Sequence, residues 1–195
     1  MNILLAITGA SGSIYGLRLL EELLKAGQQV TLVASRSGLE VCRFETGVAL
    51  DDAEALMRRW DLPEAVLTIR AENDLWAPEA SGSAAPEAMV IAPCSMGTVG
   101  RIAAGISGTL IERAADVLLK EARPLILLPR ETPLSAIHLE NLLRLAHAGA
   151  RIVPAMPAFY HGPQSLDDLV NFVVGKLLDQ LGINHSLFRR WGSEA

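Results

Sequence analysis

Aromatic side chains, cysteines and excess positive charge are all scarce in this sequence of 195 residues. Only 5% of the residues are aromatic, although 50% are hydrophobic. The hydrophobic residues are therefore mainly Ala, Leu, Ile and Val, which is typical of a helix-covered parallel sheet rather than of a β-sandwich. The net charge of −5 argues against nucleic acid as a partner, because proteins that bind it carry basic surfaces.

No metal site, membrane span or targeting segment is predicted. Cys42 and Cys94 form no Cys-x-x-Cys pair, and the four histidines show no metal-ligand spacing. The longest uncharged stretch, residues 1–17, is interrupted by Gly and Ser, whereas a span needs about 20 mainly apolar residues. This stretch also lacks the basic start of a signal peptide. We therefore expect a soluble, cytoplasmic protein with both cysteines reduced and buried.

Short apolar runs alternate with helical patterns, which predicts an α/β fold. Strands are predicted over residues 2–8, 30–34, 65–69, 88–92, 125–128 and 151–153. Helices are predicted over residues 14–26, 51–60, 109–120, 135–147 and 165–181, with a short one opened by Ser37. We expect one domain over residues 1–195, built as a three-layer, doubly wound, mostly parallel sheet with helices on both faces.

Several helix starts carry a hydroxyl residue followed three positions later by a carboxylate, the sequence pattern of a capping box. The pattern occurs at Ser37, Thr109 and Ser165. The last helix is strongly amphipathic, and its predicted apolar face comprises Leu166, Leu169, Val170, Val173, Leu177 and Leu181.

Two loops rich in small and hydroxyl residues follow predicted strands, at the edge where such sheets bind ligands. Residues 9–13 lack the dinucleotide, Walker and nucleophile-elbow patterns, and we favour phosphate binding there over a tight turn capped by serine. In residues 93–98, Ser95 and Thr98 stand at a helix start, where capping by Ser95 explains the sequence as well as ligand binding does. Together the loops suggest a ligand with a phosphate and a polar ring.

A third loop, residues 129–133, places Arg130 and Glu131 between two prolines directly after a strand. The alternative here is a surface ion pair, which stabilises a protein by only ~0–1 kcal/mol. We favour a functional role, because Arg binds phosphate through two donors and a partly desolvated Glu suits proton transfer.

Other candidates are less distinctive. Glu45 fits a solvated carboxylate at a helix end, and Lys176 fits a snorkelling lysine as well as a phosphate ligand. Tyr160 lies in a loop after the last predicted strand, where packing against other side chains explains it equally well. Trp76 and Trp191 lie in a loop and a tail, where an indole usually covers something and its face attracts cations.

With these loops assembled, the sequence resembles the UbiX-type flavin prenyltransferases. The segments Leu-Pro-Arg-Glu-Thr-Pro and Phe-Tyr-His-Gly-Pro-Gln-Ser-Leu-Asp-Asp-Leu-Val are its most specific signals. The matching stretches cover most of the chain: residues 8–20, 76–98, 110–145, 154–176 and 189–192.

The resemblance implies a flavodoxin- or Rossmann-like fold and transfer of a dimethylallyl group from dimethylallyl phosphate to N5 and C6 of reduced FMN. The prenylated FMN would serve a UbiD-type decarboxylase, often in ubiquinone biosynthesis. The family also implies a homo-oligomer, typically a dodecamer, with sites between subunits. The tail, about residues 182–195, is expected to pack on a neighbouring subunit.

Motif positions imply roles for individual residues. FMN would be held by Gly9, Ala10, Ser11, Ser35, Ser95, Met96, Gly97, Thr98 and Arg130. The residues near the reacting atoms would be Ser11, Glu45, Lys120 and Glu131. The prenyl phosphate would be held by Tyr160 and Lys176. Apart from the motifs, breaking the allylic C–O bond leaves a cation that needs aromatic faces, for which Trp76 and Trp191 are candidates. Gly108 and Thr109 depart from the polar pair that the family usually carries there.

Two other functions are weighed against this one. An FMN-dependent cysteine-type decarboxylase would carry a histidine in its N-terminal half and a Pro-Ala-Ser-Ala-Asn-Thr loop. Here the first histidine is His138, and the loop reads Pro-Cys-Ser-Met-Gly-Thr. A non-catalytic FMN-binding carrier would not need Glu45, Glu131 and Lys176.

Overall fold

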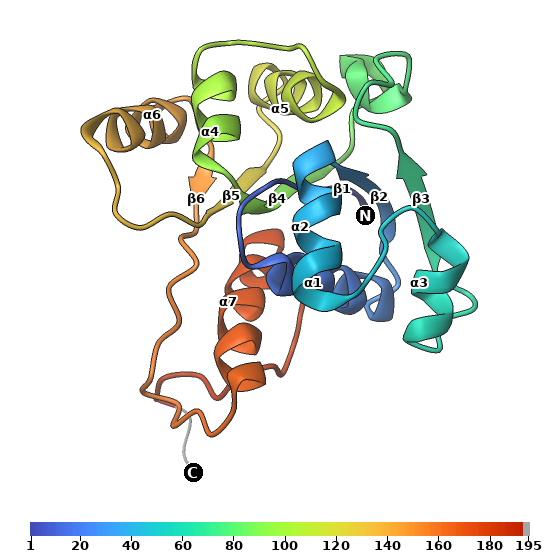
Figure 1. Cartoon of the computed structure of the whole chain (residues 1–195), viewed down its shortest axis with the longest axis vertical. Helices are drawn as coiled ribbons and strands as arrows, with labels where there is room; N and C mark the ends of the chain where they lie inside the picture. The colour runs from blue at the N-terminus through green and yellow to red at the C-terminus, as the bar shows by residue number, and fades with distance from the viewer. Residues whose placement is uncertain (193–195) are drawn as a thin grey trace.

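The computed structural model describes residues 1–192 and contains one six-stranded sheet (Figure 1). The strands are β1 Asn2–Ile7, β2 Gln29–Ala34, β3 Val66–Arg70, β4 Ala88–Cys94, β5 Leu125–Pro129 and β6 Arg151–Ile152. Their order is β3-β2-β1-β4-β5-β6, and every neighbouring pair is parallel. The order reverses between β1 and β4, which is the switch point where doubly wound sheets bind ligands.

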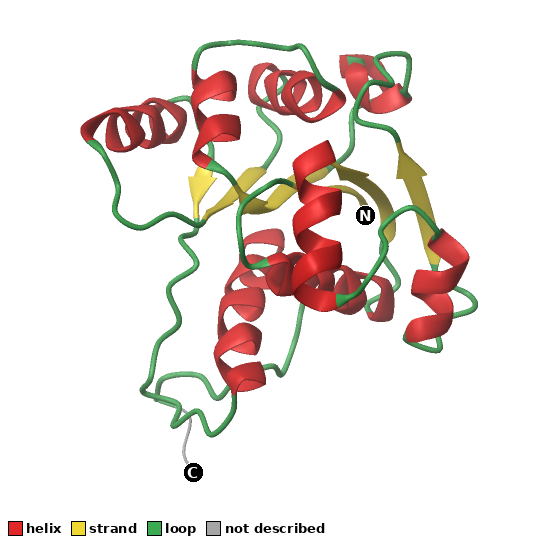
Figure 2. Cartoon of the chain, in the orientation of Figure 1, coloured by secondary structure: helices red, strands yellow, loops and turns green. Residues whose placement is uncertain are grey.

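Helices cover both faces of the sheet, as Figure 2 shows. They are α1 Ser13–Lys25, α2 Arg36–Thr46, α3 Ala53–Arg59, α4 Met96–Ala103, α5 Leu110–Lys120, α6 Ala136–His147 and α7 Leu166–Leu181, with 3-10 turns at Pro78–Ala80 and Gly82–Ala84. α4, α5 and α6 lie over one face and α1 and α7 over the other. The predicted three-layer, doubly wound architecture is confirmed.

Alternation along β1 explains the two cores. Ile3, Leu5 and Ile7 pack with α1 and α7, whereas Leu4 and Ala6 pack with α4 and α5. All five side chains are fully buried, because successive residues of a strand point to opposite faces and both faces are covered.

Two local predictions are wrong. Ser35, not Ser37, caps α2, and its hydroxyl accepts a hydrogen bond from the Gly38 N–H at 3.0 Å. The helix starts two residues earlier because it follows β2 directly. Leu166 is 67% exposed rather than part of the apolar face, since the first turn of α7 extends beyond the sheet. The capping boxes at Thr109 and Ser165 are confirmed.

The segment after α7 folds back along that helix. Ile183, Leu187 and Phe188 pack against the core formed by α1 and α7. Gly175 makes this approach possible, because a Cβ there would lie 2.5 Å from Phe188 Cε1. The predicted contact of the tail with a neighbouring subunit stays a prediction, and residues 193–195 lie outside the described part. No helix within residues 1–192 is long and apolar enough to cross a membrane.

Candidate functional site

The loops after β1, β2 and β4 meet at the carboxyl edge of the sheet. Backbone and side-chain bonds lock them together: the Thr8 hydroxyl donates to the Pro93 carbonyl at 2.8 Å and accepts from the Ser95 N–H at 2.8 Å. The Ser35 N–H donates to the Ile7 carbonyl at 2.9 Å. This edge therefore brings together the predicted binding residues of three separate loops.

Arg130 adds the loop after β5 to the same edge. Its Nε donates to the backbone oxygen of Ser11 at 2.9 Å, and its N–H donates to the Cys94 carbonyl at 3.4 Å. Glu131 is exposed, and its carboxylate accepts from the Thr132 N–H at 3.0 Å. Each member of the charged pair thus has another partner, and Arg130 is bound to the loop that carries Ser11.

Glu45, at the end of α2, reaches the start of α1. Its carboxylate accepts from the backbone N–H groups of Gly12 at 3.0 Å and Ser13 at 2.9 Å. Burial alone would raise the pKa of Glu45. Hydrogen bonds from the Ser11 hydroxyl and from the N–H groups of Ser13 and Gly12 outweigh this effect of burial. The pKa of Glu45 is therefore lowered. Glu45 is therefore an ionised acceptor that occupies the N–H groups for which the sequence predicted a phosphate. Phosphate binding at this loop stays a prediction. The alternative, a serine cap, is wrong, because the cap is Gly12 at φ 102°.

The loop after β4 presents hydroxyls at the start of α4. The Ser95 hydroxyl caps the helix, accepting from the Thr98 N–H at 3.2 Å, and it lies 3.0 Å from the Thr98 hydroxyl. Met96 is buried beneath the loop, so that it offers a ligand only its backbone. Capping and ligand binding are both open to Ser95, because its oxygen retains further hydrogen-bonding capacity.

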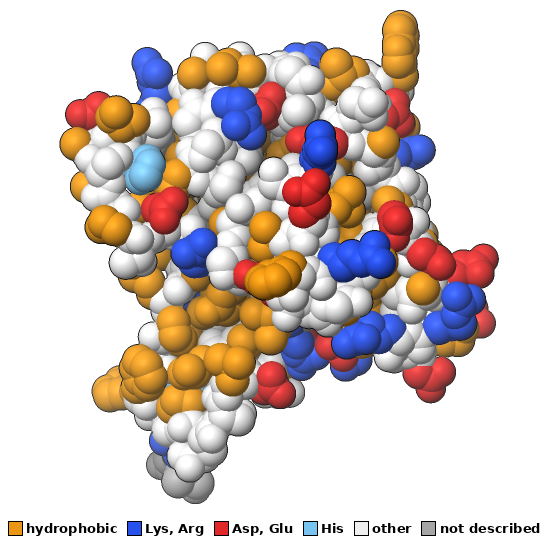
Figure 3. Space-filling model, viewed as in Figure 1, with side chains coloured by type: hydrophobic (Ala, Val, Ile, Leu, Met, Phe, Trp, Pro, Cys, Tyr) orange, Lys and Arg blue, Asp and Glu red, His pale blue; other side chains and the backbone are white. Residues whose placement is uncertain are grey.

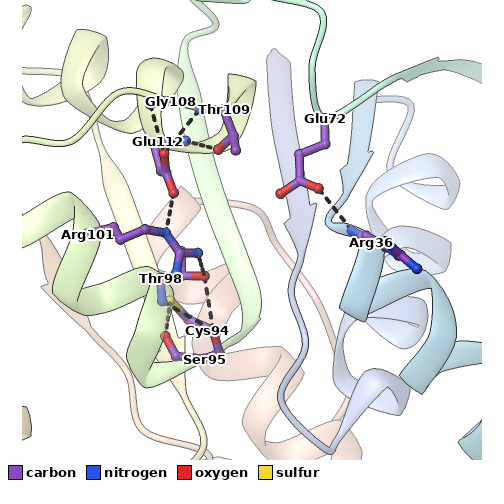
Figure 4. Close-up of polar contacts among 9 residues, drawn as sticks. All are labelled: Arg36, Glu72, Cys94, Ser95, Thr98, Arg101, Gly108, Thr109 and Glu112. Atoms are coloured by element: carbon purple, nitrogen blue, oxygen red, sulfur yellow. Dashed lines mark hydrogen bonds and ion pairs between the residues drawn. The ribbon is translucent and has the colours of Figure 1, made fainter.

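A second polar network, which sequence reasoning missed, supports this helix start (Figure 4). The Arg101 Nε donates to the buried Glu112 carboxylate, and its Nη2 donates to the Thr98 hydroxyl at 3.3 Å. The other oxygen of Glu112 accepts from the Gly108 N–H at 2.9 Å and the Thr109 N–H at 3.1 Å. The capping-box pattern in the sequence identifies Glu112 as a cap. The signal that could have linked Arg101 to this network is its spacing, because residues three apart on a helix, such as Thr98 and Arg101, are neighbours.

Across from this network, Glu72 accepts from the Arg36 N–H at 2.9 Å, at the start of α2. A pocket of about 590 Å³ lies between the two sides. Its lining includes Arg36, Leu39, Ile69, Glu72, Gly108 and Thr109.

Three predicted residues form a separate group on an arm made by α7, the loop before it and the tail. The Tyr160 and Trp191 rings are 5.3 Å apart, centre to centre, at 86°. Lys176 lies 5.8 Å above the Phe188 ring, and its Nζ is 3.7 Å from Asp179. Figure 3 shows hydrophobic side chains gathered over this arm. The exposed ones there include Met156, Phe159, Leu166 and Trp191.

Two predicted residues are not brought to the carboxyl edge within one chain. Lys120 ends α5 just before β5 begins, which places it at the opposite, amino edge of the sheet, 3.3 Å from Glu121. Trp76 is 98% exposed, in the segment between β3 and β4.

The cysteines and acidic residues provide no metal centre within residues 1–192. Cys42 and Cys94 are free and buried, and burial raises the pKa of Cys94 to about 12.

The chain is similar to several known proteins. Residues 1–178 match the family described as Flavoprotein. A flavin prenyltransferase UbiX of Halalkalibacterium halodurans is 51% identical over 189 residues, which is 96% of this chain and 92% of that protein. A solved structure of AnUbiX (PadA1) in complex with FMN and dimethylallyl pyrophosphate has a TM-score of 0.91 at 38% identity, covering 100% of this chain and 98% of the other. A solved structure of a dodecameric FMN-dependent UbiX-like decarboxylase of Escherichia coli O157:H7 has a TM-score of 0.89 at 40% identity. The match covers 99% of this chain and 100% of the other.

Proposed function

The chain belongs to the flavin prenyltransferase UbiX family of flavoproteins, and we propose that it transfers a dimethylallyl group from dimethylallyl phosphate to reduced FMN, with bonds at N5 and C6. The observation that carries this proposal is the convergence of Ser11, Glu45 and Arg130 at the switch point of the sheet, joined by hydrogen bonds. Donors for a flavin and a carboxylate for proton transfer thus meet in one place.

The residues at this edge fit FMN. A flavin ring needs donors and acceptors along its polar edge and space for a flat body, and its phosphate needs N–H, hydroxyl or cationic donors. Ser35, Ser95 and Thr98 supply hydroxyls, and small residues leave room between them. A Cβ on Gly97 would lie 3.9 Å from the Ser95 hydroxyl and partly fill this space. Bound FMN supplies the nucleophilic ring atoms of the reaction.

The two glutamates suit different proton-transfer tasks. Glu45 is held ionised beside Ser11, so it can accept a proton and steady the loop near the reacting atoms. Glu131 is exposed next to Arg130 and is our assignment for the base that removes the proton lost when C6 of the flavin ring forms its new bond.

The arm supplies what the prenyl phosphate needs. Tyr160 and Lys176 would bind its phosphate and stabilise the charge that develops on departure. An allylic cation would be stabilised by the faces of Trp76 and Trp191. Lys120 is proposed as a further phosphate ligand.

These groups lie apart within one chain, so we propose that the site is completed by neighbouring copies in a homo-oligomer. The exposed apolar side chains of the arm are suited to such contacts, since a monomer rarely leaves a patch of this kind uncovered. The dodecameric relative makes a dodecamer the assembly we propose. We further propose that the protein acts in the cytoplasm and that its product serves a UbiD-type decarboxylase.

The proposal is tested by anaerobic incubation with reduced FMN and dimethylallyl phosphate, followed by mass spectrometry of the released flavin. We expect a flavin heavier by one five-carbon prenyl unit. Dimethylallyl diphosphate is tested in a parallel reaction, because the relative AnUbiX was solved with it. Tight binding of FMN that stays unmodified with both donors would contradict the transferase and favour a decarboxylase or a flavin carrier.

A further inference from the structure

The residues assigned to FMN offer its phosphate a single cationic side chain. All of them are neutral except Arg130, whose Nε is bound to the Ser11 carbonyl. The net charge of −5 gives a dianionic phosphate no general attraction to the protein. A further cation at the site would therefore matter for affinity.

Carboxylates of this chain already occupy two of the three helix starts around the site. Glu45 holds the N–H groups at the start of α1, and Glu72 holds the Arg36 N–H at the start of α2. A phosphate at either position would meet a negative charge within a few ångströms, which is unfavourable. The remaining direction leads to the start of α4, where the side chain of Arg101, from the second turn, reaches Thr98.

Arg101 is held in place by a buried anion. Glu112 is only 2% exposed, and its carboxylate accepts from Arg101, Gly108 and Thr109. This pairing fixes one edge of the guanidinium, while the Nη2 is directed at the Thr98 hydroxyl. An arginine oriented in this way loses little freedom when it binds a ligand.

One nitrogen of Arg101 remains available. Within residues 1–192, no acceptor is found for its Nη1, and the side chain is 47% exposed. A Cβ on Gly97 would lie 3.4 Å from Nη1, so the glycine leaves this nitrogen uncovered on the side of the Ser95 hydroxyl. Figure 4 shows the guanidinium beside Thr98 and above Ser95.

We propose that Arg101, positioned by Glu112, is an FMN-binding residue that contacts the phosphate of the cofactor together with Ser95 and Thr98. The inference rests on the proposed function, because it assumes that FMN binds at this edge. It adds a binding residue that neither the motifs nor the comparisons assign.

The test compares FMN with riboflavin, which lacks the phosphate. Both oxidised flavins are titrated into the full-length protein and followed by fluorescence quenching. We expect Arg101→Gln to weaken FMN binding about tenfold or more while riboflavin binding stays the same, since a hydrogen bond to a charged group is lost. Arg101→Lys should restore part of the preference, because it keeps the charge without the fork.

Arg144→Gln is the matched control. It removes the same charge, and its guanidinium contacts the opposite end of α4, at the Ala103 carbonyl, 3.3 Å away. It should leave the ratio of FMN to riboflavin affinity unchanged. An Arg101→Gln variant that loses affinity for both flavins equally, or for neither, overturns the inference. A wild-type protein that binds no FMN overturns the proposed function itself.

Discussion

The Arg130 guanidinium donates a hydrogen bond to the backbone oxygen of Ser11, 119 positions earlier in the chain, at 2.9 Å. This contact joins the loops after β1 and β5 across the intervening β4. It fixes the backbone of the first loop at Ser11 and holds the residue next to Glu131 against that loop. The relative positions of acid–base and flavin-binding groups are thus set before any ligand arrives.

Glu131→Gln tests the assignment of Glu131 as the base. We expect product formation to slow about 10²–10⁴-fold, the usual contribution of general acid–base catalysis, while FMN affinity is retained. The rate is measured by the anaerobic assay. Glu140→Gln, at an exposed position of α6, is the control and should have the wild-type rate. A Glu131→Gln protein as fast as wild type would remove Glu131 from the mechanism.

Sites shared between chains predict complementation. Glu131→Gln impairs the flavin side of the site, and Lys176→Ala impairs the arm. If the two come from different copies, assemblies co-expressed from both variants contain some sites without any substitution and regain activity that neither variant has alone. Mixed assemblies as inactive as their parents would show that one chain supplies both residues.

The hydrogen bonds to Glu45 predict a pH-dependent contribution to stability. Its folded pKa is lowered, so the contribution is present above the ordinary carboxyl pKa of about 4.3 and is lost as the pH falls through the folded value. Wild type should therefore exceed Glu45→Gln in free energy of unfolding at pH 6.5, and the gap should narrow at pH 3.5. Chemical denaturation at the two pH values measures it. Glu40→Gln, at an exposed position of the same helix, is the control and should differ much less from wild type in free energy of unfolding. A difference for Glu45→Gln that grows at the lower pH would refute the argument.

The buried thiols should be inert. Both cysteines are fully buried, and a pKa of about 12 for Cys94 leaves almost no reactive thiolate at neutral pH. Native protein at pH 8 should therefore take up no iodoacetamide within the time that labels both residues after denaturation, as read by mass spectrometry. Rapid native labelling of Cys94 would indicate that β4 opens locally.

Features of the fold that depend on residues close together in the sequence could be predicted. The capping boxes at Thr109 and Ser165 are examples, because side chain and backbone lie within one turn. Ser37 was assigned wrongly as the cap of α2, because the end of β2 decides where that helix starts and Ser35 is the residue found there. The sheet brings Glu45 to Gly12 and Arg101 to Glu112, and no local pattern encodes those distances.

Part of the candidate site could be predicted from the residues themselves. The strand ends and their loop residues singled out Ser95, Arg130 and Glu131, whereas Ser35 was assigned to FMN only through resemblance to a family. Lys176 and Trp191 illustrate the limit. Their distance from the flavin loops in one chain fits the proposal that a second copy completes the site, and an oligomeric contact leaves no periodic signature in the sequence.

Gly175→Ala tests whether the tail supports the prenyl-phosphate site. The added Cβ would lie 2.5 Å from Phe188 Cε1 and 2.6 Å from His185 Cε1, so the tail has to shift. Such overpacking typically costs about 1–3 kcal/mol. Because Phe188 lies beneath Lys176 and Trp191 contacts Tyr160, we expect the KM for dimethylallyl phosphate to rise several-fold while FMN affinity, set at the other group of residues, stays constant. Steady-state kinetics together with a flavin titration separate the two effects. Equal weakening of both ligands would mean that the tail supports the fold as a whole and not the arm in particular.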